Sequence, residues 1–366
     1  MKSMKKLVLV GLVLLASVMV LVGCQMEPQG LKIYKFSTKP VILTDYKSPN
    51  NTDDSWTYVA FGDWPQTIKD NSVIIDENNT IQMGMFTYYL GNDGNYYVKI
   101  TVKPYKDEYT YLYSDNKTKV KEGETVYFKV EPIVWRVLNS KDKDYSKSNN
   151  ALLLAENILV GGIPYYVSGS ERTIPDINLI GGGPNTVFAN NYQYSTIRAW
   201  LNGGYADRDV QETNYENEGF FQTAFTGDAQ TWIVTTTVDN TAQSTNPDGA
   251  PEEWNEGKNI CASGTTEDKI FLLSVQEITN ENYGFPAYTE AGTESHRIRI
   301  ATDYAIATGA EQSYALDVGG SWWLRSPHYI NYLAHFISNI GGIDGYNSAV
   351  DICKRGVVPA LCIQLQ

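Results

Sequence analysis

Side chains that could do chemistry are concentrated between residues 328 and 353. This stretch, HYINYLAHFISNIGGIDGYNSAVDIC, mixes Tyr, His, Asn and Asp with no helical or strand period. Tyr buries much area at a small entropic cost and Asn adapts its hydrogen bonds, so such a mixture favours noncovalent recognition. The residues that we expect to contact a ligand are His328, Tyr329, Asn331, Tyr332, His335, Ser338, Asn339, Asp344, Tyr346, Asn347, Asp351 and Cys353.

Metal binding and catalysis fit the sequence less well than recognition does. His328 and His335 are seven residues apart, and with only two Asp nearby they match no known metal-site spacing. A Ser-His-Asp constellation would need His296, and no G-x-S-x-G elbow is present. The glycine-rich stretch at 179–186 lacks the Lys of a phosphate-binding loop. We therefore predict no metal, no cofactor and no catalytic residue.

The four cysteines do not suggest a disulfide framework. If Cys24 carries a lipid, an odd number remains, namely Cys261, Cys353 and Cys362. Cys362 lies in an apolar run and is expected to be a buried hydrophobic side chain. Cys353 is expected to be an exposed thiol.

Apolar residues on both sides of 328–353 are expected to hold this stretch in place. Trp322 and Trp323 precede it, and the apolar run at 357–361 follows it. A binding surface tolerates varied side chains only if residues outside it fix its backbone. Arg325 is expected to form a buried framework ion pair, with a partner that the sequence does not identify. Apolar positions that could pin strands inside the stretch are Leu333, Ala334, Ile337, Ile343 and Val350.

The N-terminus has the features of an export signal. Three Lys precede an apolar run at 7–22, which is shorter than the roughly 20 residues of a membrane span. No basic stop-transfer flank follows, so residues 1–23 are expected to be a signal peptide. The run ends in Leu-Val-Gly-Cys, which resembles a bacterial lipobox. That resemblance implies cleavage before Cys24 and lipidation of its thiol.

The mature chain is expected to be an acidic, lipid-anchored, extracytoplasmic monomer. Removal of residues 1–23, with three Lys and no acidic residue, changes the net charge from −13 to −16. Such a charge argues against nucleic acid and against anionic membranes as binding partners. Residues 24–50 are predicted to form a tether with one short strand around 33–36. Gln25 is compatible with sorting to the outer membrane and cell surface.

Aromatic and β-branched residues punctuated by Gly and Asn predict a β-rich domain with few helices. The sequence YYLGNDGNYYVKITV at 88–102 predicts a tight hairpin. Residues 123–139 are expected to form two strands that meet at Pro132. The best helix lies within 194–205, with Ser195 as its N-cap and Asn-Gly as its stop signal.

Several motifs in one order connect this chain with a known family. They are FGDWPQT, VWRVLN, ALLLAENIL, STIRAWLN, FLLS, ATDYA, WWLRSP and GVVPAL. Together they resemble a bacterial family of extracytoplasmic domains of unassigned activity, from about residue 56 to 366 with an insertion between 68 and 125. That family is similar to the formylglycine-generating-enzyme subclass of C-type lectin folds. The resemblance implies an α+β, C-type lectin-like domain over 51–366.

The stretch 328–353 is also similar to the variable region of lipoproteins diversified by retroelements, including those of spirochaetes. In that region, mutated adenines scatter Asn codons into codons for Tyr, His, Ser, Ile, Asp, Gly and Cys. The chain departs from the wider family at His328, where Gly is usual, and at Val358, where Arg is usual. The resemblance implies a surface protein, not an enzyme, that binds varied protein or cell-surface ligands. The alternatives are an invariant adhesin or glycan-binding lipoprotein, and a formylglycine-generating-type oxidase that uses Cys353 and Cys362.

Overall fold

The computed structural model divides the chain into two units, Met1–Lys32 and Ile33–Gln366. The residues that the structure describes are 32–50, 56–105, 111–139, 150–174, 185–204, 214–241, 245–246, 261, 263–288, 295–313, 319–346 and 348–364. Within these residues the fold is β-rich with few, short helices, as predicted. They include no helix that is both long and apolar enough to cross a bilayer.

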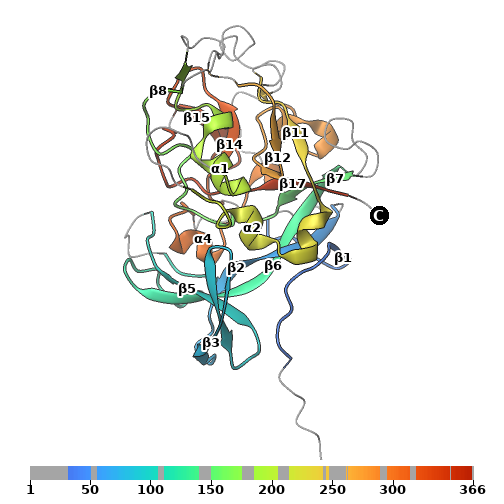
Figure 1. Ribbon diagram of the computed structural model, residues 1–366, viewed down its shortest axis with the longest axis vertical. Coiled ribbons are helices and arrows are strands. Elements are labelled where there is room, and N and C mark those ends of the chain that lie inside the picture. Colours follow the sequence, from blue (N-terminus) through green and yellow to red (C-terminus); the bar gives the residue numbers. More distant parts are fainter. Residues whose placement is uncertain are drawn as a thin grey trace, which may run out of the picture. The chain divides into compact units, whose positions relative to one another are not determined.

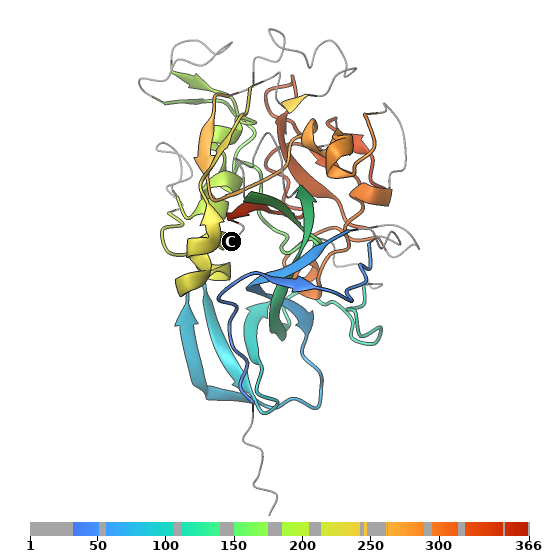
Figure 2. The same cartoon turned by 90° about the vertical axis from the view of Figure 1, so that its right-hand side faces the viewer.

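The main sheet runs through the centre of the second unit and pairs its strands in antiparallel fashion (Figures 1 and 2). Its main path is β10-β17-β7-β6-β5-β4-β3; β2 pairs with β1 and β6, and β13 pairs with β17. The strands are β1 Val41–Leu43, β2 Tyr58–Ile68, β3 Ile75–Met83, β4 Phe86–Gly91, β5 Tyr96–Thr101, β6 Thr125–Asn139, β7 Asn150–Ala155, β10 Ile233–Val234, β13 Ile270–Phe271 and β17 Ala360–Gln364.

Smaller elements surround this sheet. A three-stranded sheet has the order β14-β15-β16, and two further pairs join β8 to β9 and β11 to β12. These strands are β8 Arg172–Thr173, β9 Thr186–Val187, β11 Thr236–Val238, β12 Thr266–Asp268, β14 Trp322–Pro327, β15 Ala334–Ile337 and β16 Ile343–Asp344. The helices are α1 Thr196–Asn202, α2 Phe220–Ala224 and α4 Asp303–Ala307, with 3-10 turns η1 Tyr192–Tyr194, η2 Gly227–Trp232, η4 Glu277–Thr279, η5 Glu281–Tyr283 and η6 Ser295–Arg297.

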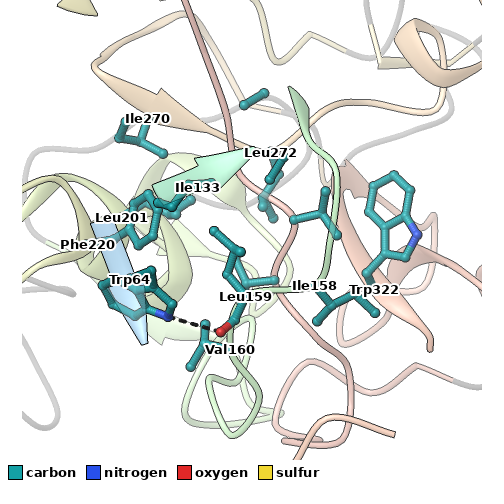
Figure 3. Close-up of a cluster of buried hydrophobic side chains, with 14 of the residues drawn as sticks. Trp64, Ile133, Ile158, Leu159, Val160, Leu201, Phe220, Ile270, Leu272 and Trp322 are labelled. Carbon is teal, nitrogen blue, oxygen red and sulfur yellow. Dashed lines mark hydrogen bonds between the residues drawn. The ribbon is translucent and has the colours of Figure 1, made fainter. Parts of the chain in front are cut away.

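The core lies between the main sheet, α1 and α2, and β14. Figure 3 shows Trp64 of β2 with Leu201 of α1 and Phe220 of α2 in one buried cluster. The Trp64 indole nitrogen donates a hydrogen bond to the Leu159 carbonyl at 3.0 Å, so this buried polar atom is satisfied. The cluster also includes Trp322 of β14, so the strand before residues 328–353 is fixed by the common core.

The predicted hairpin is confirmed as β4 and β5, with Gly94 at φ +81° in the turn. The prediction of two strands around Pro132 is wrong, because β6 continues through that residue. Pro132 lies opposite Asp63, beside a register shift in β2 where Gly62 has φ +72°. This bulge lets the strand pair accept a residue with no N–H donor.

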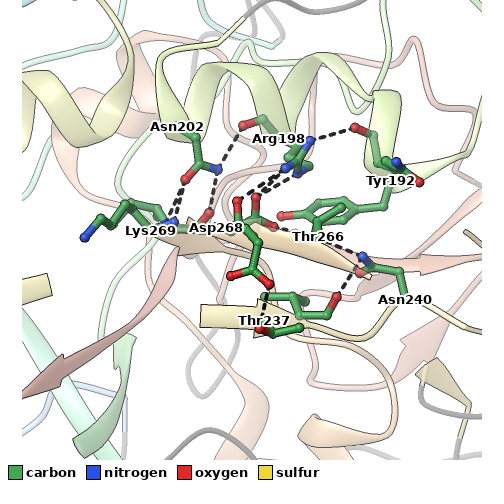
Figure 4. Close-up of polar contacts among 12 residues, drawn as sticks. Tyr192, Arg198, Asn202, Thr237, Asn240, Thr266, Asp268 and Lys269 are labelled. Carbon is green, nitrogen blue, oxygen red and sulfur yellow. Dashed lines mark hydrogen bonds and ion pairs between the residues drawn. The ribbon is translucent and has the colours of Figure 1, made fainter. Parts of the chain in front are cut away.

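The predicted helix is confirmed as α1. The Ser195 hydroxyl accepts a hydrogen bond from the Arg198 N–H at 3.2 Å, and Gly203 ends the helix at φ +70°. Figure 4 shows two polar contacts from α1 to the strand segment beneath it. Arg198 Nε donates to Asp268 at 2.8 Å, and Asn202 Nδ2 donates to the Ile270 carbonyl at 2.8 Å.

Residues 33–50, which we call the N-terminal strap, correct the predicted tether. The strap belongs to the folded unit, and its strand is β1 rather than residues 33–36. The Phe36 ring packs at 5.3 Å from each of the Tyr88 and Tyr96 rings. Periodicity could not predict this packing, because the partners of the strap are distant in the chain.

Candidate ligand-binding site

Three tyrosines from residues 328–353 lie at or near the surface, on two neighbouring segments. Tyr332 and Tyr346 are 46% and 57% exposed, which is unusual for large aromatic side chains in this unit. Tyr329 is half-buried, and its hydroxyl lies 3.5 Å from that of Tyr346. We call Tyr329, Tyr332 and Tyr346 the aromatic patch.

Backbone pairing brings the two segments together. Leu333 and Ala349 form an isolated β-bridge, and the Val350 N–H donates to the Tyr332 carbonyl at 3.0 Å. The chain around Tyr346 therefore runs beside the loop that joins β14 to β15. This pairing uses main-chain atoms, so it does not depend on which side chains the surface carries.

A buried amide holds the loop from below. Asn190 Nδ2 donates to the carbonyls of His328 at 2.8 Å, Ile330 at 3.0 Å and Leu333 at 2.7 Å. The Asn190 N–H donates to the Asn331 carbonyl at 3.1 Å. Asn190 is fully buried and just follows β9. It fixes the course of the loop through backbone carbonyls alone.

The two histidines do not face solvent, which corrects our prediction for them. His328 and His335 are both fully buried. The His328 ring lies 4.2 Å from the Tyr329 ring, 4.8 Å from the Tyr346 ring and 5.4 Å from the His335 ring. The imidazoles thus support the aromatic patch from inside. Sequence reasoning missed this because β15 is buried on both faces and has no alternation of polar and apolar residues.

Hydrogen bonds assign the proton positions of the two rings. The Ile330 N–H donates to His328 Nδ1 at 3.1 Å, so a neutral His328 carries its proton on Nε2. His335 Nδ1 lies 3.2 Å from the Ser326 carbonyl, which can only accept, so His335 carries its proton on Nδ1. Burial, and then the neighbouring His328, lowers the pKa of His335 to about 3. His335 is therefore neutral near pH 7.

Gly345 fits closely against both imidazoles. A Cβ atom at this position would lie 2.6 Å from His328 Cδ2 and 3.1 Å from His335 Cδ2. The close approach, rather than the backbone angles, requires glycine here. Positions 328, 335 and 345 therefore form one packing unit whose residue types depend on one another.

The other predicted contact residues are distributed as follows. Asp344 is half-buried and accepts a hydrogen bond from the Tyr346 N–H at 2.8 Å, which places it beside the aromatic patch. Asp351 and Cys353 are exposed. Asn347 lies outside the described residues. Three more residues are half-buried, namely Asn331, Ser338 and Asn339. Within the described residues, no group of three or more His, Cys, Asp or Glu side chains could hold a metal ion.

The framework ion pair predicted for Arg325 is confirmed, and its partner is Glu277. Both Glu277 carboxylate oxygens accept from the Arg325 guanidinium, one of them at 3.1 Å from Nη2. Arg325 Nε also donates to Asn240 Oδ1 at 3.1 Å. This bidentate pair fixes β14 just before the loop. The partner lies 48 residues away in sequence, which explains why sequence reasoning did not find it.

The cysteine environments differ from that of a reactive pair. Cys362 lies within β17, opposite Leu152 of β7, and burial raises its pKa to about 12. Burial, and then the charge of Asp351, raises the pKa of Cys353. Catalytic thiols need the opposite shift, towards the thiolate.

Comparison with known proteins gives two matches. The chain is 26% identical, over 274 residues, to a protein named probable beta-galactosidase C from Aspergillus clavatus. That alignment covers 72% of this chain but only 25% of the fungal protein. No solved structure matches the chain. Residues 148–365, more than half of the chain, match a family described as a domain of unknown function, DUF6273, and the chain therefore belongs to the DUF6273 family.

Proposed function

We propose that this protein is a surface-displayed lipoprotein that binds varied protein or cell-surface ligands through the aromatic patch and its neighbours. In this proposal, Cys24 carries the lipid that attaches the protein to the membrane. The domain is a C-type lectin-like fold of the formylglycine-generating-enzyme subclass. Exposed positions between 328 and 353 are diversified, as in the variable lipoproteins of diversity-generating retroelements. The protein works as a monomer without a cofactor.

The observation that carries the proposal is that contacts to main-chain atoms hold the loop, while its tyrosine side chains are exposed. Asn190 and the Leu333–Ala349 bridge hold main-chain atoms, whereas the Tyr332 and Tyr346 side chains point to solvent. A ligand-binding surface can change its side chains only where its backbone is fixed independently of them. Exposed tyrosines also suit recognition, because each ring buries a large area with few rotatable bonds.

Binding can be tested with a random-peptide phage library selected on the full-length protein in lipid vesicles. Binders to the patch should lose at least about tenfold in affinity with Tyr346→Ala, since buried aromatic contacts often contribute 2 kcal/mol or more. Ile74→Ala is the control, because Ile74 is 70% exposed and lies outside residues 328–353. Binders that are insensitive to Tyr346→Ala and Tyr332→Ala, or equally sensitive to Ile74→Ala, would contradict the proposal.

Diversification can be tested by sequencing the locus in many cells of one strain. We expect substitutions at exposed positions such as Tyr332, Tyr346 and Asp351. His328, His335 and Gly345 should stay constant or change together, because their side chains occupy one packed space. An even spread of substitutions along the gene would contradict targeted diversification of residues 328–353, and the alternative of an invariant adhesin would then be favoured.

Glycan recognition is a second candidate, favoured by the match to a probable beta-galactosidase. Glycosidases use two carboxylates across the scissile bond. Residues 328–353 carry two, Asp344, which accepts from the Tyr346 N–H, and the exposed Asp351. Cleavage of a fluorogenic galactoside, lost in Asp344→Asn or Asp351→Asn, would replace the binding proposal by an enzymatic one. Binding to galactose-terminated glycans without cleavage, and sensitive to Tyr346→Ala, would identify the ligand class as carbohydrate.

A further inference from the structure

The N-terminal strap is fixed to the folded unit near its first residue. The Tyr34 N–H donates to the Gly94 carbonyl in the β4–β5 turn at 2.7 Å. The Ser37 N–H donates to Asp63 Oδ2 at 2.7 Å, and the Tyr34 hydroxyl donates to the other oxygen of the same carboxylate. With the Phe36 ring packed between Tyr88 and Tyr96, the chain enters the unit at the β4–β5 turn.

The other end of the strap is also locked in place. Asn50 Nδ2 donates to the Glu156 carbonyl at 2.7 Å, and Asn50 Oδ1 accepts from the Ile300 N–H at 2.7 Å. Glu156 is itself buried and paired with Arg136 at 2.7 Å. Because β1 pairs with β2 between these two ends, the strap cannot detach and add its length to the chain between Cys24 and Ile33 without breaking packed structure.

The aromatic patch is carried by elements far from the β4–β5 turn. Figures 1 and 2 share one vertical axis, and both place the hairpin of β3, β4 and β5 at the lower end of the unit. The labels of β8, β14 and β15 lie in the upper half of Figure 1. Asn190, which follows β9, ties the patch loop to this upper region.

The length of chain between the expected lipid at Cys24 and the strap limits the orientations that the folded unit can take relative to the membrane. From Cys24 to Ile33 there are 33 − 24 = 9 residue steps, which span at most about 32 Å when fully extended. A compact unit of the length Ile33–Gln366 has a radius of gyration of roughly 20 Å and a diameter of roughly 50 Å. If the upper end of the unit touched the membrane, Ile33 at the lower end would lie about 50 Å from the membrane. The segment from Cys24 to Ile33 is too short to span that distance.

We propose that the strap holds the domain with its β4–β5 turn towards the membrane, so that the aromatic patch binds ligands in trans. The partner is then a molecule in the medium or on another surface, and not the bilayer that holds the anchor. This inference rests on the lipid anchor of the proposed function, and it adds the orientation and the side from which the ligand arrives.

Energy transfer from labelled thiols to an acceptor dye in the lipid headgroups tests the orientation of the full-length protein on vesicles. Cys261 and Cys362 are buried, so a Cys353→Ser background leaves one introduced thiol to label. In that background Tyr346→Cys labels the aromatic patch, and Ile74→Cys labels the β4–β5 turn, because the Asn92 N–H in that turn donates to the Ile74 carbonyl. We expect strong transfer from position 74 and weak transfer from position 346.

A longer segment between Cys24 and the strap is the matched control. Insertion of about 30 Gly and Ser residues after Gln29 should raise transfer from position 346 to the level of position 74, because the extended chain of about 39 residues, roughly 130 Å long, would then exceed the diameter of the unit. Equal transfer from both positions without the insertion would overturn the orientation but leave ligand binding intact. Failure of the protein to float with vesicles would overturn the lipid anchor, and with it both the orientation and the proposed surface display.

Discussion

Replacement of Asn190 by Ala tests whether one buried amide fixes the ligand-binding loop. The two hydrogens of the side-chain NH2 group are shared among three carbonyls, and each full hydrogen bond contributes roughly 0.5–1.5 kcal/mol net to stability. The Ile330 and Leu333 carbonyls keep backbone partners in the variant, since they also accept from the N–H groups of Leu333 and His328. We therefore expect a loss of about 1–3 kcal/mol in the free energy of unfolding, rather than the larger cost of fully unsatisfied groups.

Urea denaturation measures this loss, and hydrogen exchange locates it. The His328 and Leu333 amide protons should exchange faster in Asn190→Ala, because the loop that they close is no longer clamped. Asn191→Ala is the matched control: Asn191 is also buried, but its side chain makes none of these bonds to the loop. If both variants lose the same stability, or if exchange at the two amides stays unchanged, the amide does not support the loop and the reasoning is refuted.

Three further outcomes follow from the same region. Gly345→Ala should cost about 1–3 kcal/mol by overpacking, and His328→Ala should relieve much of that cost in the double variant; additive losses in urea denaturation would show that the two positions do not touch. The unfolded chain protonates His335 near its ordinary pKa of 6.5, but the folded protein does so only near 3, so this residue removes stability as the pH falls from 6.5 towards 3, by about 3 kcal/mol at pH 4. His335→Gln should flatten that part of the unfolding free-energy profile, and an unchanged slope would mean that His335 is charged in the folded state. Cys353 should react with a thiol reagent in the folded protein and Cys362 only after unfolding; rapid labelling of Cys362 would restore the oxidase alternative.

Local signals in the sequence predicted local structure well. The β4–β5 hairpin follows from its turn residues, and α1 follows from the cap at Ser195 and the stop at Gly203. Each of these depends on contacts within a few residues along the chain. The framework role of Arg325 could also be predicted, because an Arg between buried apolar residues needs a carboxylate partner.

Features that depend on distant partners could not be predicted. The single strand through Pro132 needs the bulge in β2, about 70 residues earlier in the chain. The burial of His328 and His335 depends on Gly345 and the patch tyrosines. These covering residues are of the same types as the exposed residues of 328–353. Residue type alone therefore could not separate the supporting imidazoles from the displayed side chains.

The N-terminal strap also determines where mechanical force enters the domain. A pull between the lipid and a bound ligand would reach the unit at Tyr34 and Ser37. It would be resisted by the β1–β2 pairing and by the Asn50 bonds to Glu156 and Ile300. The patch loop is held by other contacts, namely those of Asn190 and the strand β14. Tension on the tether should therefore peel the strap before it distorts the binding surface.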